Sequence, residues 1–267
     1  MTINTLSHDL DRYNGNWDKV SLNFTPYTPM AYNKKREGHL CFFLIKARVA
    51  GFDGVVFTDT NATRTSDQHR AEGLEGLALV DFKAVRSSPR PWDKEGWFRP
   101  VQAEVLVPNR IDLRWVAKIV FVSNASLQEA ERLWGNNPHP PFEVERQCFC
   151  DTPSSKIPSF SFLSKIILTD DHVDENNVNQ SRPHRVRFCR PLSKRITLVA
   201  SVYATTGTIA EILWQPVQRS QQGEFETTSH YWHWPSIPIG VFPDGRCSVE
   251  YRLGGIRWST LEFEVYP

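Results

Sequence analysis

From residue 159 onward the sequence repeats one pattern, in which a segment of strand length is followed by Gly, Pro, Asp or Asn. The segments are apolar or alternate between apolar and polar residues, and they lie at 159–168, 184–189, 195–205, 208–217, 247–253 and 259–266. Helical periodicity is weak throughout this half, and short strands at such spacing are typical of an all-β sandwich. Nine Trp and eighteen Pro among 267 residues also favour a β-rich chain over a helix bundle.

The first half combines strand and helix signals. One helix is predicted over 126–135, with Ser126 as its N-cap, Glu129 completing a capping box and Gly135 as its stop. The segment 76–82 is either a strand or the start of a helix. Apolar segments predict strands at 20–24, 40–49, 54–58, 103–107 and 117–122.

Two breaks rich in Pro, Asn and Ser separate these halves, at 135–143 and 150–159. We place a domain boundary between them, because the sequence pattern differs on the two sides. The expected fold class is α+β, with a mixed domain over 1–145 followed by an all-β sandwich, an accessory or binding domain, over 151–267.

Composition excludes several classes of protein. The formal net charge of +1 provides no global attraction for nucleic acid, so such binding must come from a local patch. The N-terminus has no apolar core typical of a signal peptide, and no run reaches the length of a membrane span. Five Cys without CxxC spacing predict free thiols in a reducing cytoplasm and no metal site.

Glu104 is the residue that does not fit its surroundings, since it opens the apolar segment "AEVLV". A buried carboxylate is costly unless it is paired, solvated or needed for chemistry. One interpretation is a salt bridge with Arg99 or Lys118 on a solvated strand face. The other is a catalytic carboxylate at the mouth of a strand.

Three pieces of the first half occur together: "VSLNFTPYTPMAYN" (20–33), "GVVFTDTNATRT" (54–65) and "RPVQAEVLV" (99–107). In this order they resemble the DarT family of NAD-dependent ADP-ribosyltransferases, toxins that modify bases of single-stranded DNA. The resemblance covers about residues 17–125. It implies an ADP-ribosyltransferase-like split sheet with a cleft, NAD as the substrate, and an antitoxin or other protein partner, for which residues 151–267 are a possible binding surface.

The resemblance also assigns residues. Glu104 becomes the catalytic carboxylate, which stabilises the oxocarbenium-like ribose as nicotinamide leaves. The expected NAD pocket is lined by Phe24, Tyr27, Met30, Tyr32, Asn61 and Ala62. For the aromatic residues, ordinary core packing is the alternative role, and for Asn61 the alternative is forming a turn.

Basic and aromatic residues between 64 and 99 are expected to hold the single-stranded DNA, because Arg contacts phosphate and Trp stacks on bases. The predicted contacts are Arg64, Arg70, Arg90, Trp92, Trp97 and Arg99. Acidic residues in the same loop leave a solvated, salt-bridged loop as the alternative. A second basic segment, 182–195, has no acidic residue and is a candidate phosphate track.

Two departures from the family pattern keep a second interpretation open. Tyr27 stands where the family has an Arg that contacts the NAD phosphates, and a phenol does not replace a guanidinium. The family's N-terminal His-x-Thr element has no counterpart, since His8 lies in no matching context. The alternative to a toxin-like or anti-phage transferase is therefore an inactive relative that binds nucleic acid or a partner protein. A third possibility is modification of RNA or protein.

Overall fold

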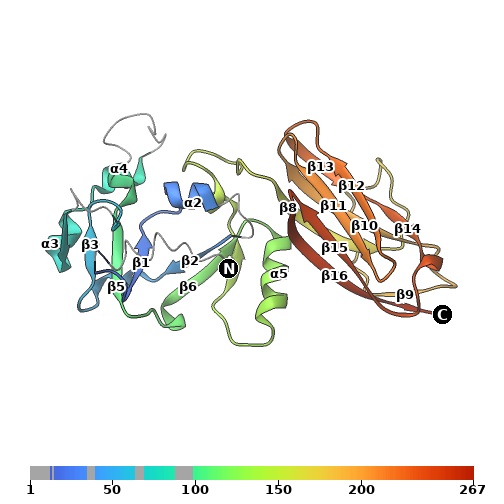
Figure 1. The fold of residues 1–267 in the computed structure, drawn as a ribbon, viewed down its shortest axis with the longest axis horizontal. Helices are drawn as coiled ribbons and strands as arrows, with labels where there is room; N and C mark the ends of the chain where they lie inside the picture. The colour runs from blue at the N-terminus through green and yellow to red at the C-terminus, as the bar shows by residue number, and fades with distance from the viewer. Residues whose placement is uncertain (1–12, 14, 35–39, 64–68, 88–98) are drawn as a thin grey trace.

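The computed structural model describes residues 13, 15–34, 40–63, 69–87 and 99–267. It consists mainly of strands with a few short helices. The two halves of the chain follow one another along its long axis, with the first half at the left and the second half at the right of Figure 1. None of the helices in these ranges is long and apolar enough to cross a membrane.

A four-stranded sheet forms the outer part of the first half, in the order β1 (Lys19–Asn23), β5 (Glu104–Pro108), β3 (Val56–Thr58), β4 (Arg70–Glu72). β5 pairs antiparallel with β1 and β3, so that Asn23 lies opposite Glu104. Alternate residues point to opposite faces of a strand. One face is apolar and packs in a core under α4 (Phe82–Arg86), and it carries Val20, Leu22, Phe57, Val105 and Val107.

The opposite face of the same sheet is more polar. Ser21 on β1, Glu104 and Leu106 on β5, and Thr58 on β3 follow the alternation onto this face. The strand that the apolar run predicted therefore exists, and Glu104 begins it on the side away from the apolar core.

A three-stranded sheet connects the halves, in the order β2 (Cys41–Ile45), β6 (Val116–Phe121), β7 (Phe142–Val144). Helix α5 (Asn124–Trp134) follows β6 directly and contacts β8 and β16 of the second half. The remaining short helices of the first half are α2 (Pro29–Lys34), α3 (Gly73–Ala78), η1 (Ala47–Gly51), η2 (Pro100–Gln102), η3 (Leu113–Trp115) and η4 (Arg146–Phe149).

Two local predictions differ from the structure. The N-cap of α5 is Ser123 and not Ser126, because the Ser123 hydroxyl accepts the Ser126 N–H at 3.3 Å. Glu129 binds Arg132 instead of returning to the cap. Gly135 does end the helix, with a positive φ of 67° that a glycine adopts without strain. The ambiguous segment 76–82 contributes to α3 and α4.

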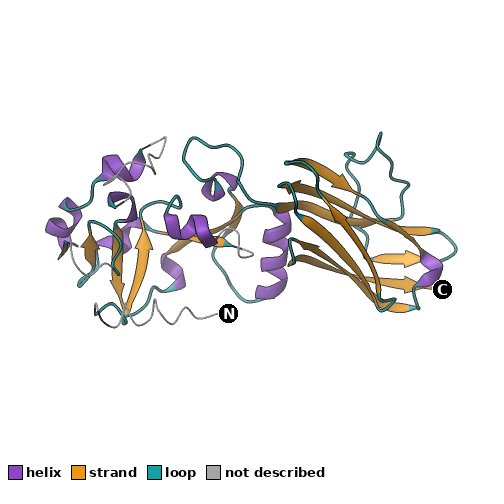
Figure 2. Cartoon of the chain, turned by 45° about the horizontal axis from the view of Figure 1, so that its top comes forward, coloured by secondary structure: helices purple, strands orange, loops and turns teal. Residues whose placement is uncertain are grey.

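The second half contains two sheets (Figure 2). In one, β10 (Arg195–Ala204) pairs with β8 (Phe162–Thr169), β13 (Ser229–His233) and β14 (Ser236–Pro238). The other has the order β12 (Arg219–Glu224), β11 (Ile209–Gln215), β15 (Gly245–Leu253), β16 (Ile256–Tyr266), β9 (Arg187–Cys189), and η5 (Ile239–Val241) lies between β14 and β15. Leu198, Ile212 and Val249 belong to one apolar cluster that both sheets share.

This cluster also takes residues from the first half. Val120 on β6, Val122, Ala125 on α5 and Phe149 on η4 are buried in it together with the sheet residues of the second half. The Ser123 hydroxyl donates to the Leu163 carbonyl of β8, which adds a polar link across the same contact. The compositional break near residue 150 is therefore not a break in packing.

The shared core makes one prediction about stability. Phe149→Ala removes a fully buried ring that packs on Phe42 at 5.0 Å between centroids, and it should lower the free energy of unfolding by about 3–5 kcal/mol. Phe43→Ala is the matched control, because that ring is 47% exposed and its loss should change stability far less. Urea unfolding followed by circular dichroism measures both, and equal effects of the two variants would contradict a core that continues across residue 150.

Candidate functional site

Glu104 is a buried carboxylate at the first position of β5. Its side chain belongs to a residue only 4% exposed, and its backbone N–H donates to the Thr58 hydroxyl at 3.1 Å. Glu104 therefore does not lie on a solvated strand face, where the salt-bridge interpretation places it. Lys118, one of the two cations considered as partners of Glu104, lies on β6 of the three-stranded sheet. It pairs with Glu143 at 2.8 Å and with Glu145, and hydrogen bonds to these two carboxylates raise the pKa of Lys118.

Three neutral donors orient the Glu104 carboxylate. The Ser21 hydroxyl of β1 donates to Oε2 at 2.8 Å, and the Ala62 N–H donates to the same oxygen at 3.3 Å. The Asn61 amide donates to Oε1 at 3.3 Å. Hydrogen bonds of this kind favour the charged form of a carboxylate and fix its orientation.

Residues 58–63, which begin at the last residue of β3, supply two of these donors, and hydrogen bonds within this segment fix its shape. The Asn61 side-chain oxygen accepts the Thr63 N–H at 2.9 Å and also the Thr63 hydroxyl, which is an Asx turn. Thr58 donates to the Thr60 carbonyl at 2.5 Å. Asn61 therefore forms the turn that was considered for it, and it also contacts the carboxylate, while its expected place in an NAD pocket stays a prediction.

Asn16 is a site residue that sequence reasoning missed. It is 5% exposed, and its amide nitrogen donates to the Ala62 carbonyl at 3.1 Å, 46 positions away in the chain. Nothing in "NGNWDKV" marks this residue, because the contact depends on how two distant loops meet. No pattern of residue types around position 16 could have identified it.

A hollow of about 580 Å³ lies on the same face of the sheet as Glu104. It begins beside Leu106, the next residue of β5 on that face, and extends towards β4. Such a volume is within the range of ligand pockets. The residues that line it include Asn16, Lys19, Val56, Arg70, Leu106 and Pro108.

The aromatic residues expected in one pocket are distributed over several environments. Phe24 packs in the apolar core, where its ring stacks on Phe57 at 6.4 Å and meets Phe82 edge-on at 5.3 Å. The Tyr27 hydroxyl donates to the Gln147 carbonyl at 3.3 Å. Met30, on α2, is 55% exposed, and the side chain of Tyr32 lies outside the described residues.

A second, smaller hollow of about 340 Å³ lies where β1 ends, and Asn23 at this end is the register partner of Glu104. Phe24, Tyr27, Phe82 and Arg86 line it, together with Pro153 of the segment that leads to the second half. The Arg86 guanidinium lies over the Phe82 ring at 5.5 Å. Phe24 and Tyr27 are thus brought together here and not in the hollow beside Leu106.

The predicted nucleic-acid residues are only partly described. Arg70 is exposed on β4 and lines the larger hollow, and Arg99 is exposed just before η2. Arg64, Arg90, Trp92 and Trp97 lie outside the described residues.

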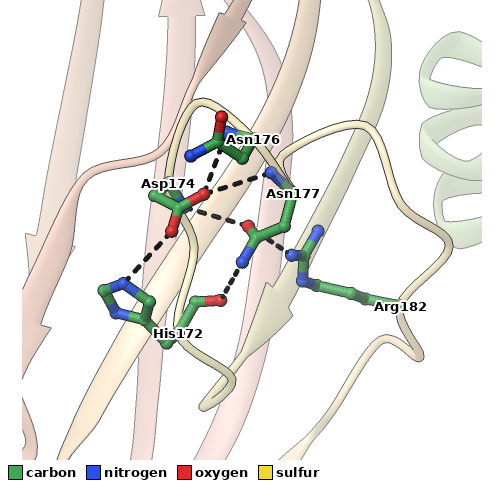
Figure 3. A network of polar contacts seen from close by, with 5 residues as sticks. All are labelled: His172, Asp174, Asn176, Asn177 and Arg182. Atoms are coloured by element: carbon green, nitrogen blue, oxygen red, sulfur yellow. Dashed lines mark hydrogen bonds and ion pairs between the residues drawn. The ribbon is translucent and has the colours of Figure 1, made fainter.

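The basic segment 182–195 is not a surface of one sign. Arg182 binds the Asn177 side chain at 2.6 Å, in a network with His172, Asp174 and Asn176 (Figure 3). Further along, Arg185 pairs with Asp170, Arg187 with Glu264 and Arg190 with Asp244. These acidic neighbours come from distant segments, and they reduce the charge available to a phosphate track.

The His-rich stretch 230–235 contributes to the sheet around β10. His230 makes a hydrogen bond with the Ser201 hydroxyl at 2.6 Å, and burial together with the nearby Arg146 lowers the pKa of His230. Burial also lowers the pKa of His233. Both imidazoles are therefore biased towards the neutral form.

Comparison with known proteins identifies a family. A family model described as ssDNA thymidine ADP-ribosyltransferase, DarT, matches residues 6–150. The resemblance predicted from the three sequence pieces is confirmed, and the match is longer than the one expected. A comparison with curated proteins gave no match.

Several solved structures are similar to part of the chain. Thermus sp. 2.9 DarT in complex with carba-NAD+ has 20% identity and a TM-score of 0.43, over 50% of this chain and 74% of that one. The same Thermus protein in complex with ADP-ribosylated ssDNA has 19% identity and a TM-score of 0.44, over 51% and 70%. Thermosipho africanus DarTG in complex with ADP-ribose has 21% identity and a TM-score of 0.40, over 50% and 36%.

The hydrogen bonds at the carboxylate predict an effect on stability. Asn61→Ala removes one donor to buried Glu104 and the acceptor for Thr63, so it should lower the free energy of unfolding by about 1–3 kcal/mol. Asn137→Ala is the matched control, because its amide makes one hydrogen bond at an exposed helix end and its loss should stay within about 0.5 kcal/mol. Thermal unfolding measures both, and an Asn61 variant as stable as the control would contradict the network.

Proposed function

Because the chain belongs to the DarT family, described as ssDNA thymidine ADP-ribosyltransferase, we propose that it transfers ADP-ribose from NAD to a base of single-stranded DNA, thymidine by that description. In this reaction the bond between the ribose C1′ and the nicotinamide nitrogen breaks, and its electron pair leaves with nicotinamide. A ring nitrogen of the base forms the new bond to C1′ and loses its proton. Positive charge develops on the ribose between these events.

The position of Glu104 is the observation that carries this proposal. A carboxylate that is already oriented before substrate binds needs no reorganisation when positive charge develops near it. Ser21, Asn61 and Ala62 provide that orientation from two separate parts of the chain. Under this proposal Glu104 stabilises the ribose cation, and Asn61 and Ala62 hold the carboxylate in place.

The larger hollow is the proposed binding site for NAD. It lies on the same face of the sheet as Glu104, and Lys19 and Arg70 in its lining are the proposed contacts for a pyrophosphate. Asp18 and Glu72 belong to the same lining, and Asp18 pairs with Lys19 at 3.1 Å, so the lining carries both signs of charge. The smaller hollow is the proposed site for the acceptor strand, with Phe24, Tyr27 and Phe82 as aromatic surfaces and Arg86 as a phosphate contact. Glu104 itself lines neither hollow: the larger one begins beside Leu106 on the Glu104 face, and the smaller one lies at the end of β1 next to α4.

The second half has a separate proposed role. We propose residues 151–267 as a β-sandwich accessory domain that binds a protein partner such as an antitoxin, next to a transferase domain over 1–145. The two sheets support the sandwich part of this proposal, and the apolar cluster that they share also takes residues from the first half. A toxin-like role in the cytoplasm, within a toxin–antitoxin or anti-phage system, completes the proposal.

One observation favours an inactive module as the second candidate. Tyr27 occupies the position of the family's phosphate-binding Arg, and its hydroxyl is engaged by the Gln147 carbonyl. A chain that has lost this charge would still present the aromatic hollow and Arg86 to a nucleic acid. In that case the protein would bind a single strand and modify nothing.

The first test removes the charge of the carboxylate. Glu104→Gln should lower incorporation of labelled ADP-ribose into a single-stranded oligonucleotide by at least about 100-fold, because the ribose cation loses its counter-charge. Ser21→Ala is the matched control, since it removes one hydrogen bond to Oε2 and keeps the carboxylate, and it should lower the rate less. Circular dichroism of both variants verifies folding. Incorporation that survives Glu104→Gln would exclude the assigned role, and tight oligonucleotide binding without incorporation by the native chain would favour the module.

The second test restores the family's charge. Tyr27→Arg should raise incorporation by about tenfold, because a guanidinium adds a forked donor for phosphate that a phenol lacks. Tyr27→Phe keeps the ring and removes the hydrogen bond to Gln147, so it should leave the rate near that of the native chain. Steady-state kinetics with NAD compares the variants, and a Tyr27→Arg variant that is slower than Tyr27→Phe would contradict this account of position 27.

A further inference from the structure

Asn16 contacts the loop whose residues Asn61 and Ala62 donate hydrogen bonds to Glu104. It lies in the turn before β1, where its carbonyl accepts the Lys19 N–H at 3.0 Å, so its backbone is fixed relative to the sheet. Its side chain is directed at the Ala62 carbonyl, 3.1 Å away. Because a carbonyl only accepts, the group that faces it must be the amide nitrogen of Asn16.

Ala62 connects this hydrogen bond to the carboxylate. The N–H of Ala62 donates to Glu104 Oε2, and the side chain of the preceding residue, Asn61, donates to Oε1. The Asn16 amide holds the same residue by its carbonyl, on the opposite side of the peptide chain. The contact with Asn16 and the two donors to the carboxylate thus lie on two adjacent residues of one loop.

The other half of the Asn16 amide has an unusual environment. Its side-chain oxygen is buried, and no donor reaches it from the residues that the structure describes. A buried acceptor without a donor lowers stability by an amount that is similar to the gain from one hydrogen bond. The stabilising contribution of the amide nitrogen and the destabilising contribution of the amide oxygen thus nearly cancel. Net stabilisation of the fold therefore does not explain an asparagine at this position.

We propose that Asn16 is a positioning residue, which sets the place of the Glu104 carboxylate through Ala62 and the 58–63 loop. This role rests on the proposed transferase function. Asn16 also lines the hollow on the Glu104 face, so its side chain borders both this hollow and the loop that contacts the carboxylate. Asn16 touches no reacting atom in this account and acts only through the loop.

The experiment compares Asn16→Ala and Asn16→Asp with the native chain. Asn16→Asp keeps the shape of the side chain and places an oxygen where the donor was. Both variants should lower kcat for ADP-ribose transfer by roughly 10- to 100-fold, while KM for NAD changes less than about threefold, because a misplaced carboxylate affects the transition state more than binding. The melting temperature of Asn16→Ala should shift by less than about 4 °C.

A matched control separates positioning from general damage. Ser126→Ala removes another buried polar side chain, which lies 4% exposed on α5 and away from Glu104, and kcat should stay at the native value. Hydrogen exchange provides a readout without catalysis: amides of residues 58–63 should exchange faster in Asn16→Ala, with the rest of the sheet unchanged. A native kcat in Asn16→Asp, a loss that appears only in KM, or exchange accelerated across the whole sheet would overturn the proposal.

The two hypotheses fail in different ways. If the native chain transfers no ADP-ribose, the proposed function fails, and the exchange rates still decide whether Asn16 holds the loop. If the native chain is active and both Asn16 variants match it, the transferase stands and the positioning role is wrong.

Discussion

The first half is organised around the buried carboxylate of Glu104 and the hydrogen bonds that it accepts. Glu104 begins a strand, and its oxygens collect donors from β1 and from the loop after β3, so three segments far apart in the chain meet at one group. An unsatisfied buried carboxylate would lose its charge or unfold its surroundings. The network links the position of the carboxylate to the geometry of the loop.

The two faces of this sheet have different roles, because one packs in the apolar core and the other carries the candidate site. Val105 and Val107 face the core under α4, while Glu104 and Leu106 lie on the opposite face, where Leu106 lines the hollow. The period of two along β5 allows one short strand to serve both purposes. Substitutions on the two faces should therefore affect different properties of the protein.

Sequence reasoning located the strand and the carboxylate, because an ionisable residue at the head of an apolar run is a local signal. It also singled out Asn61, from a match to the family's loop and as a turn former, but it did not predict the contact of Asn61 with Glu104. It did not locate Asn16, the partners of Arg185 and Arg190, or Phe149 as a core residue shared by both halves, because each depends on contacts between distant segments. The N-cap of α5 was placed three residues late for a related reason, since Ser123 is selected by its buried surroundings next to Leu163.

The cluster that joins α5 and η4 to the second half bears on how such chains diversify. The residues just before position 150 already belong to the packing of the segment that follows, so recombination at the visible change of composition would separate a pair of fitted surfaces. An exchangeable accessory module would have to carry its own complement to Val120, Val122 and Ala125. A chimera that keeps the first half of this chain and exchanges the second must therefore rebuild this contact at the same time.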